Sequence, residues 1–345
     1  MTVQTGTMTA AVLAAAGRLA LEERPLPALR RADDVLLDVQ CCGICGTDLH
    51  ILSDPPGHPA NVGVVLGHEF VGVVRDVGDA VTGFEPGDRV VVAANISCGQ
   101  CAWCRRGLVN HCESFSTHGI FVDGGLAPSA VVPARSCFPI SPSVPAHLAA
   151  LAEPLSTVVN GAKLAAVFPG ETAVVVGAGP IGLMFTALLS AAGAAVIALE
   201  PSEERLGLAV TMGAAAAIDP RHEDVVARVR RLTDGLGGDC VVDAVGSQLP
   251  KALDLVRRAG RIVLFGMNSK ARAEIAQNRI TRDELSILGG YVGCPEDVFP
   301  VAVSLLEQAR VDLTPLVTHR VPLSGLPDAI DELRAARAVK VEVEP

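Results

Sequence analysis

Two rhythms of hydrophobic and polar positions divide the chain at about Leu151. Before this point, from Met8 to about Gly119, short Val-rich runs are separated by Gly, Pro and Asp. Short apolar runs bounded by turn-forming residues are typical of an all-β region with irregular loops. The clearest expected strands of this region are Val35–Val39, Phe70–Val77 and Arg89–Val92.

After Leu151, apolar segments of strand length alternate with helical segments. This alternation predicts a parallel, doubly wound sheet, because parallel neighbours need a crossover helix between them. The expected strands are Ala173–Val176, Ala195–Leu199, Ala215–Ile218, Cys240–Asp243, Arg261–Phe265 and Leu285–Leu288.

The end of the chain changes pattern once more. We expect an amphipathic helix over Pro300–Ala309 and a final alternating strand over Val339–Val343, a tail that packs back on the first domain. The chain is therefore predicted to be an α/β protein with two domains. Residues 1–155 and 298–345 form the first, and residues 156–297 form the second.

Composition narrows the classes of function. The chain is 50% hydrophobic and 19% charged, which provides enough apolar material for real cores and argues against disorder. Its formal net charge is −10 and its pI is about 5.3. A nucleic-acid partner needs a basic face, so we expect none.

No targeting or membrane segment is expected. The N-terminus lacks a basic stretch followed by an apolar run, so it does not resemble a signal peptide. The uncharged stretch Thr172–Leu199 is long enough to cross a bilayer, but its glycines follow a strand–turn–helix–turn–strand order that favours a buried βαβ unit. We therefore expect a cytoplasmic protein whose ten cysteines stay reduced, and clustered cysteines there indicate metal binding or catalysis.

A glycine-rich turn follows the first strand of the second domain. Gly177, Gly179 and Gly182 match the pattern GxGxxG between a strand and a helix, with Pro180 and Ile181 opening the helix. The first glycine permits the tight turn, the second allows a pyrophosphate to approach the backbone, and the third permits close helix–strand packing. The free N–H groups of the helix would face the phosphates. The turn therefore predicts a dinucleotide site.

The second strand of that domain ends at Glu200. An acidic residue at this position hydrogen-bonds the ribose hydroxyls and would repel a 2′-phosphate, so NAD is favoured over NADP. Arg205 lies on the following helix, where it either faces the adenine or is a solvated surface residue.

Four cysteines occur in one short loop, at about residues 95–115. Cys98, Cys101, Cys104 and Cys112 have the spacing C-x2-C-x2-C-x7-C, which suits a closed tetrahedral zinc site. An iron–sulfur cluster of the bacterial ferredoxin type would want three residues before the last cysteine instead of seven. A nucleic-acid zinc finger would want basic surroundings. We predict a structural zinc.

A second set of metal-binding residue types is dispersed. Cys45, His68, Glu69 and Glu153 each lie beside Gly or Pro at an expected turn. A catalytic zinc needs about three protein ligands and one open position, which these residues would supply. Taken singly, the cysteine could be a small buried hydrophobic residue and each glutamate a solvated charge. Residue types alone leave both interpretations open.

Together these motifs identify a family. The sequence resembles the zinc-containing medium-chain dehydrogenase/reductase superfamily, and most closely its polyol branch of sorbitol, threonine, butanediol and galactitol-type dehydrogenases. The resemblance covers nearly the whole chain. It implies a GroES-like β-barrel catalytic domain, carrying the structural zinc lobe, and a Rossmann domain. The motifs that carry it are CGTD (45–48), GHEFVGVV (67–74), FEPGDRV (84–90), the four-cysteine lobe, AEPL (152–155) and VGAGPIGL (176–183).

The resemblance also implies residue roles. Cys45, His68 and Glu69 match the ligands of the catalytic zinc, and Glu153 matches the carboxylate that the polyol branch places there, bound to zinc directly or through water.

Three residues that follow Cys45 match further parts of the family's site. Asp48 matches the carboxylate that orients the ligand histidine. Thr47 and His50 match the hydroxyl and the imidazole of a proton relay, although His50 could instead be structural.

The function implied is the reversible, zinc-dependent oxidation of a secondary alcohol on a polyol, sugar alcohol or cyclitol, with NAD as hydride acceptor. Threonine and 2,3-butanediol are alternative substrates. Other hypotheses are a metal-free quinone or enone reductase on the same scaffold, and a non-catalytic NAD-binding protein. The expected partners are a small-molecule substrate and further copies of the chain in a homodimer or homotetramer, with neither nucleic acid nor membrane.

Overall fold

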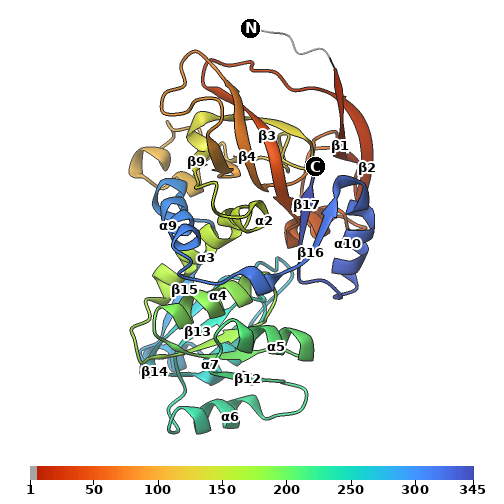
Figure 1. The fold of residues 1–345 in the computed structure, drawn as a ribbon. Helices are drawn as coiled ribbons and strands as arrows, with labels where there is room; N and C mark the ends of the chain where they lie inside the picture. The colour runs from red at the N-terminus through yellow and green to blue at the C-terminus, as the bar shows by residue number, and fades with distance from the viewer. Residues whose placement is uncertain (1–5) are drawn as a thin grey trace. The chain divides into compact units, whose positions relative to one another are not determined.

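The computed structural model describes residues 6–345, which form two compact units (Figure 1). Within the described residues, the first unit takes the chain up to Ser156 and also residues 294–308 and 317–345. The second unit comprises residues 157–293 and 309–316. The fold class predicted from the sequence, α/β with a β-rich domain and a doubly wound domain, is confirmed by the sheets described below.

A seven-stranded sheet forms the centre of the first unit. Its order is β16-β17-β3-β4-β5-β9, with β8 paired to β3. The three Val-rich runs lie within β3, β4 and β5, whose buried Val and Leu side chains pack into one core. The strands are β3 (Asp34–Gly43), β4 (Glu69–Val77), β5 (Arg89–Val92), β8 (Ser129–Pro133), β9 (Cys137–Pro139), β16 (Val317–Pro322) and β17 (Lys340–Glu344).

Smaller elements complete the first unit. Strands β1 (Thr7–Ala15) and β2 (Arg18–Pro25) form an antiparallel pair. Strands β6 (Asn95–Ile96) and β7 (Ser116–Thr117) also pair, and this pairing closes the base of the four-cysteine loop. The helices are α1 (Gly46–Ile51), α2 (Ala146–Ala149), α3 (Ala152–Ala165, which continues into the second unit), α9 (Pro295–Glu307) and α10 (Leu326–Arg334).

The second unit is built on a six-stranded parallel sheet with the order β12-β11-β10-β13-β14-β15. The central strand β10 is buried on both faces, as expected where crossover helices cover both sides. The strand order reverses between β10 and β13, where ligands of such sheets bind at the carboxyl ends of the strands. The strands are β10 (Thr172–Val176), β11 (Ala195–Leu199), β12 (Ala216–Ile218), β13 (Gly238–Asp243), β14 (Val256–Leu264) and β15 (Ser286–Gly289).

Helices connect these strands as the alternating pattern predicts. The uncharged stretch Thr172–Leu199 forms β10, α4 and β11 in that order. Within residues 6–345, no helix has the length and apolar character needed to cross a membrane. The helices of this unit are α4 (Pro180–Ala191), α5 (Glu203–Thr211), α6 (Val225–Leu232), α7 (Leu249–Leu255) and α8 (Gln277–Arg282).

The helix predicted over Pro300–Ala309 differs from helix α9. It starts at Pro295, earlier than predicted, and contains Pro300 in its interior. The start signals are Pro at the first helical position and two acidic residues in the first turn, and they outweigh the single backbone hydrogen bond that an internal proline removes. The helix ends at Glu307, because Ala309 adopts a left-handed φ of +47°.

The tail after α9 is divided between the units. Residues 309–316 group with the second unit, where the turn Thr314–Leu316 contacts α5, whereas the sequence assigned them to the first. The last strand, β17, pairs with β3 of the first unit, with Glu342 opposite Gly43.

Candidate active site

Cys45 lies at the N-terminus of helix α1, where hydrogen bonds with Asp48 fix its position. Its N–H donates to Oδ2 of Asp48 at 2.9 Å, and its side chain accepts from the N–H of Asp48, so the two residues form a reciprocal capping box. Asp48 is buried at 2% exposure. The local sequence therefore fixes both a thiol and a carboxylate at the start of this helix.

His68 and Glu69 lie where strand β4 begins. Gly67 precedes them with φ of +88°, a conformation that glycine adopts at no steric cost. In the sheet, Glu69 lies opposite Gly43, the last residue of β3. Because Cys45 follows closely after Gly43, the pairing of β3 with β4 brings the thiol to the imidazole and the carboxylate.

The ligand atoms of Cys45, His68 and Glu69 lie within 4.8 Å of one another. A thiolate, an imidazole and a carboxylate are donors that zinc prefers, and three protein ligands with an open position are typical of catalytic zinc. The donor set and its compactness fit a zinc ion.

Asp48 also faces the imidazole of His68. Its Oδ1 lies 3.7 Å from Nδ1 of His68, and neither of these buried atoms has a hydrogen-bond partner among the described residues. Burial lowers the pKa of His68, but the charges of Asp48 and Cys45 raise it well above its usual value. A carboxylate beside the outer nitrogen of a metal-binding histidine fixes its tautomer and its orientation.

Glu153 lies in the first turn of α3 and is buried at 8% exposure. It stands outside the compact group formed by Cys45, His68 and Glu69. Burial raises the pKa of Glu153, and the charges of His68 and Glu69 act on it in opposite directions. The carboxylate is therefore electrostatically part of the site without being placed among its closest donors.

Thr47 and His50 occupy helix α1 at positions i and i+3, which share a helix face. Thr47 is half-buried and His50 is exposed. An exposed imidazole can exchange protons with solvent.

Two buried charged residues of this region escaped the sequence analysis. Lys340 donates from Nζ to the backbone oxygen of Ile44 at 3.0 Å and to Oε2 of Glu69. Glu342, with 0% exposure, lies on the same strand. Burial raises the pKa of Glu342, and the charge of Lys340 lowers it. The sequence did carry a signal for these two residues. In the alternating strand they occupy positions i and i+2, so both side chains point to the same face of β17.

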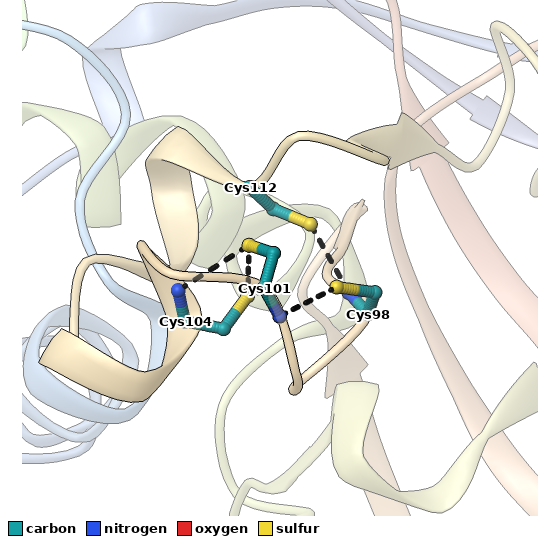
Figure 2. Close-up of side chains that lie close together, drawn as sticks. All are labelled: Cys98, Cys101, Cys104 and Cys112. Atoms are coloured by element: carbon teal, nitrogen blue, oxygen red, sulfur yellow. Dashed lines mark hydrogen bonds between the residues drawn. The ribbon is translucent and has the colours of Figure 1, made fainter.

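The four-cysteine lobe is a second and separate cluster. Its four ligand sulfur atoms lie within 4.8 Å of one another, and Figure 2 shows the side chains converging. Backbone N–H groups donate to the sulfurs: Cys101 N to Cys98 Sγ at 3.4 Å, and Cys98 N to Cys112 Sγ at 3.2 Å. Backbone donors from Cys104 and Glu113 lower the pKa of Cys101. Amides directed at sulfur favour thiolates, so the lobe fits a tetrahedral zinc.

The glycine turn of the second unit has the expected shape. Gly177 has φ of +94°, and a Cβ on Gly182 would lie 1.9 Å from the Gly177 oxygen, so the helix packs closely against the turn. A Cβ on Gly179 would meet nothing within 4 Å, which leaves open space beside the start of α4. Pro180 and Ile181, both partly exposed, form the first helical positions. The arrangement suits a phosphate at the helix N-terminus.

Glu200 follows β11 and is buried at 7% exposure. Its Oε2 accepts from Ala178 N at 2.8 Å and its Oε1 from Ser202 N at 3.1 Å, so the carboxylate is fixed against the glycine turn. Arg205 lies in the first turn of α5, and its buried Nε has no hydrogen-bond partner among the described residues.

Comparison with known proteins gives two family matches. Residues 31–142 match the alcohol dehydrogenase GroES-like domain, and residues 180–308 match the zinc-binding dehydrogenase family. The first match contains the donors Cys45, His68 and Glu69 and the four-cysteine lobe.

Individual relatives match over most of the chain. L-threonine 3-dehydrogenase from Pyrococcus horikoshii is 35% identical over 316 residues, which cover 89% of this chain and 90% of that protein. Sorbitol dehydrogenase from Halalkalibacterium halodurans is 32% identical over 336 residues, covering 95% and 96%. A structure from Sinorhizobium meliloti 1021, provisionally assigned as a zinc-binding dehydrogenase and solved with NADP, has a TM-score of 0.93 at 32% identity, covering 99% of this chain and 100% of that one.

Proposed function

Because the chain belongs to the zinc-containing medium-chain dehydrogenase family, in its polyol branch, we propose that it oxidises a secondary alcohol of a polyol, sugar alcohol or cyclitol to the ketone, reversibly, with NAD as hydride acceptor. The observation that carries the proposal is the convergence of Cys45, His68 and Glu69 within 4.8 Å. A structural cysteine or a solvated glutamate has no reason to lie in such a group.

The donors that would hold the catalytic metal all belong to the first unit. When bound, zinc polarises the alcohol oxygen as a Lewis acid and NAD accepts the hydride. Cys45, His68 and Glu69 would hold the zinc, and Asp48 keeps the imidazole of His68 in the tautomer that leaves its other nitrogen free to bind. Glu153 supplies a further carboxylate, as a ligand or through water.

Thr47 and His50 handle the alcohol proton. The hydroxyl of Thr47 would accept the proton of the alcohol and pass its own proton on toward His50, and the exposed imidazole of His50 would release a proton to solvent. Both side chains lie on the same face of α1, and this placement supports the division of roles between them.

The cysteine lobe would hold a second zinc with no part in the chemistry. Cys98, Cys101, Cys104 and Cys112 fill all four tetrahedral positions, so no position remains for a substrate. Its role is to fold a loop that has little core of its own.

The second unit would bind NAD. Gly177, Gly179 and Gly182 shape the turn, and the first turn of α4, with Pro180 and Ile181, faces the pyrophosphate. Glu200 would accept from the ribose hydroxyls, and its negative charge disfavours a 2′-phosphate. Arg205 lies on the next helix and would border the adenine.

A direct test combines metal analysis with a substrate screen. About two zinc ions per chain and NAD reduction with one class among polyols, cyclitols and amino-alcohols would support the proposal. The same screen with NADP tests the role of Glu200, since the Sinorhizobium relative was solved with NADP. One zinc per chain would contradict the catalytic metal site, and a protein without zinc would favour the metal-free reductase. Two zinc ions with no turnover on any alcohol would contradict the proposal and favour the non-catalytic protein.

L-Threonine is the second candidate substrate. The 35% identity to the Pyrococcus L-threonine 3-dehydrogenase favours it, and the amino-alcohol arm of the screen decides between the two. 2,3-Butanediol, a diol without an amino group, belongs in the polyol arm.

We also propose a cytoplasmic homodimer or homotetramer. None of the ten cysteines forms a disulfide, which supports a reducing compartment. Sedimentation of the purified protein tests the oligomeric state.

A further inference from the structure

Three charged groups converge on one glycine in the sheet of the first unit. Glu342 of β17 lies opposite Gly43 of β3, and Gly43 lies opposite Glu69 of β4. A Cβ on Gly43 would lie 2.5 Å from Oε2 of Glu69, 2.7 Å from Nζ of Lys340 and 3.0 Å from Oε1 of Glu342. The absent side chain of Gly43 therefore leaves a space bordered by the ammonium of Lys340 and by the carboxylates of Glu69 and Glu342. Of the two carboxylates, Glu69 is the one in ion-pair contact with the ammonium among the described residues.

In this space Glu69 has a hydrogen bond from Lys340, whereas one oxygen of Glu342 has no partner among the described residues. Lys340 uses one proton for the oxygen of Ile44 and one for Glu69, and an ammonium has three protons. Glu342 accepts from the thiol of Cys41 at 3.3 Å through Oε2, whereas its Oε1 has no partner among the described residues. Burying a carboxylate oxygen without a hydrogen-bond partner costs free energy. Oε1 of Glu342 is therefore an available acceptor for the ammonium of Lys340.

We propose that the ammonium of Lys340 alternates between Glu69 and Glu342, and that this sharing sets how strongly Glu69 binds the catalytic cation. This inference rests on the proposed catalytic metal site. An ammonium held on Glu69 competes with a divalent cation for the same carboxylate. Movement of Lys340 toward Glu342 frees Glu69 and leaves no ammonium unpaired in the interior. Lys340 and Glu342 are thus positioning residues that act on the metal through Glu69.

The two partners of Glu69 have opposite effects on metal affinity. Glu342→Gln keeps the shape but replaces the charged alternative acceptor with a neutral amide oxygen, which attracts the ammonium less strongly. Lys340 then stays on Glu69, and the zinc dissociation constant rises about tenfold. Lys340→Met keeps much of the length but removes the competitor, so the dissociation constant falls about tenfold. A merely structural role for the two residues predicts weaker zinc binding in both variants.

The experiment measures zinc affinity by competition with a chromophoric chelator, on the full-length protein. Cys45→Ser supplies the baseline, because it leaves only the zinc of the cysteine lobe. The second readout is the visible absorption of the cobalt-substituted protein, with Glu69→Gln as the reference for a site that lacks this carboxylate. Glu342→Gln should shift the spectrum toward that reference, and Lys340→Arg should restore wild-type affinity.

Arg261→Met is the matched control. It removes the partner of Glu171 in a half-buried ion pair of the second unit, so it should lower stability without changing zinc affinity. If Lys340→Met fails to fold, Glu342→Gln decides alone, since its side chain is nearly isosteric. The proposed sharing of Lys340 is overturned if the zinc affinities of Glu342→Gln and Lys340→Met change in the same direction. It is also overturned if Glu342→Gln leaves the zinc affinity and the cobalt spectrum unchanged. Wild-type protein with zinc only in the lobe would instead overturn the proposed function.

Discussion

The two sulfur-containing clusters of the first unit differ in how the chain brings their donors together. The four lobe cysteines lie within a single loop whose ends are joined by β6 and β7. Cys45 and the adjacent pair His68 and Glu69 come from two separate segments, and only the antiparallel pairing of β3 with β4 brings the thiol to the pair. The lobe can therefore assemble locally, whereas the dispersed cluster exists only when the sheet has formed.

The difference also concerns what each cluster leaves open. The lobe offers four thiols, enough to close the tetrahedral sphere of the zinc it would hold, and backbone amides donate to the sulfurs of Cys112 and Cys98. The dispersed cluster offers three donors of three kinds and is surrounded by buried charges that tune them, namely Asp48, Glu153 and Lys340. A cluster that one loop closes by itself suits a stabilising role. A cluster that is assembled from separate segments and surrounded by buried charges suits a catalytic role. Four substitutions test this distinction, and they are ordered by their expected effect on kcat/KM.

Cys45→Ser should lower kcat/KM about 1000-fold, because loss of a ligand removes several kcal/mol of charge stabilisation by the metal. Metal analysis should show about one zinc lost per chain, and the melting temperature should stay nearly unchanged. Cys294→Ser is the control, since that thiol is similarly half-buried but lies outside both clusters. Turnover close to wild type with one zinc missing would contradict the assignment of Cys45.

Asp48→Asn should weaken zinc binding at the dispersed cluster and lower kcat/KM by about 10- to 100-fold. The asparagine oxygen can still accept from Cys45 N, but its NH₂ group would then face Nδ1 of His68 and favour the wrong tautomer. Zinc titration and steady-state kinetics measure the two effects. Equal activity in Asp48→Asn and wild type would mean that Asp48 only caps helix α1.

How far each cluster could be predicted follows from the same distinction. The spacing of the lobe cysteines predicted their site without any knowledge of the fold. The residue types of Cys45, His68 and Glu69 left alternatives open, and family resemblance was needed to group them. Lys340 and Glu342 were missed because their neighbours are set by the pairing of β17 with β3, across almost the whole chain.

The fold itself was more predictable than the site. Periodicity located all six strands of the parallel sheet, because burial on one or both faces leaves a local pattern. In the seven-stranded sheet it located β3, β4, β5 and β17 but not β8, β9 and β16. Element ends were less predictable where signals conflict, as in α9, where Pro300 suggested a start that Pro295 and two acidic residues provide instead. The assignment of residues 309–316 to the second unit depends on a long-range contact with α5, which no local pattern records.

Gly67→Ala should lower stability by about 1–3 kcal/mol and kcat/KM by about tenfold. The position has φ of +88°, and an added Cβ would lie 2.6 Å from Cys42 Sγ and from Leu126 Cγ, so the turn before His68 must shift. Chemical denaturation and kinetics measure both. Gly83→Ala is the control, because its φ of +88° is the same but its Cβ would meet nothing within 4 Å. If the two variants lose the same activity, the turn at Gly67 does not position His68.

Cys112→Ser should have the smallest effect on chemistry and a large effect on the lobe. We expect kcat/KM within about threefold of wild type, loss of one zinc per chain, and a melting temperature lower by about 5–10 °C, as a loss of ~3 kcal/mol implies for a protein of this size. Limited proteolysis should cut the variant within the lobe, between Cys98 and Cys112, because local unfolding of this loop leaves the sheet intact. A fall in kcat/KM as large as that of Cys45→Ser would show that the lobe is coupled to the chemistry, and the separation of a closed, local cluster from an open, dispersed one would then be wrong.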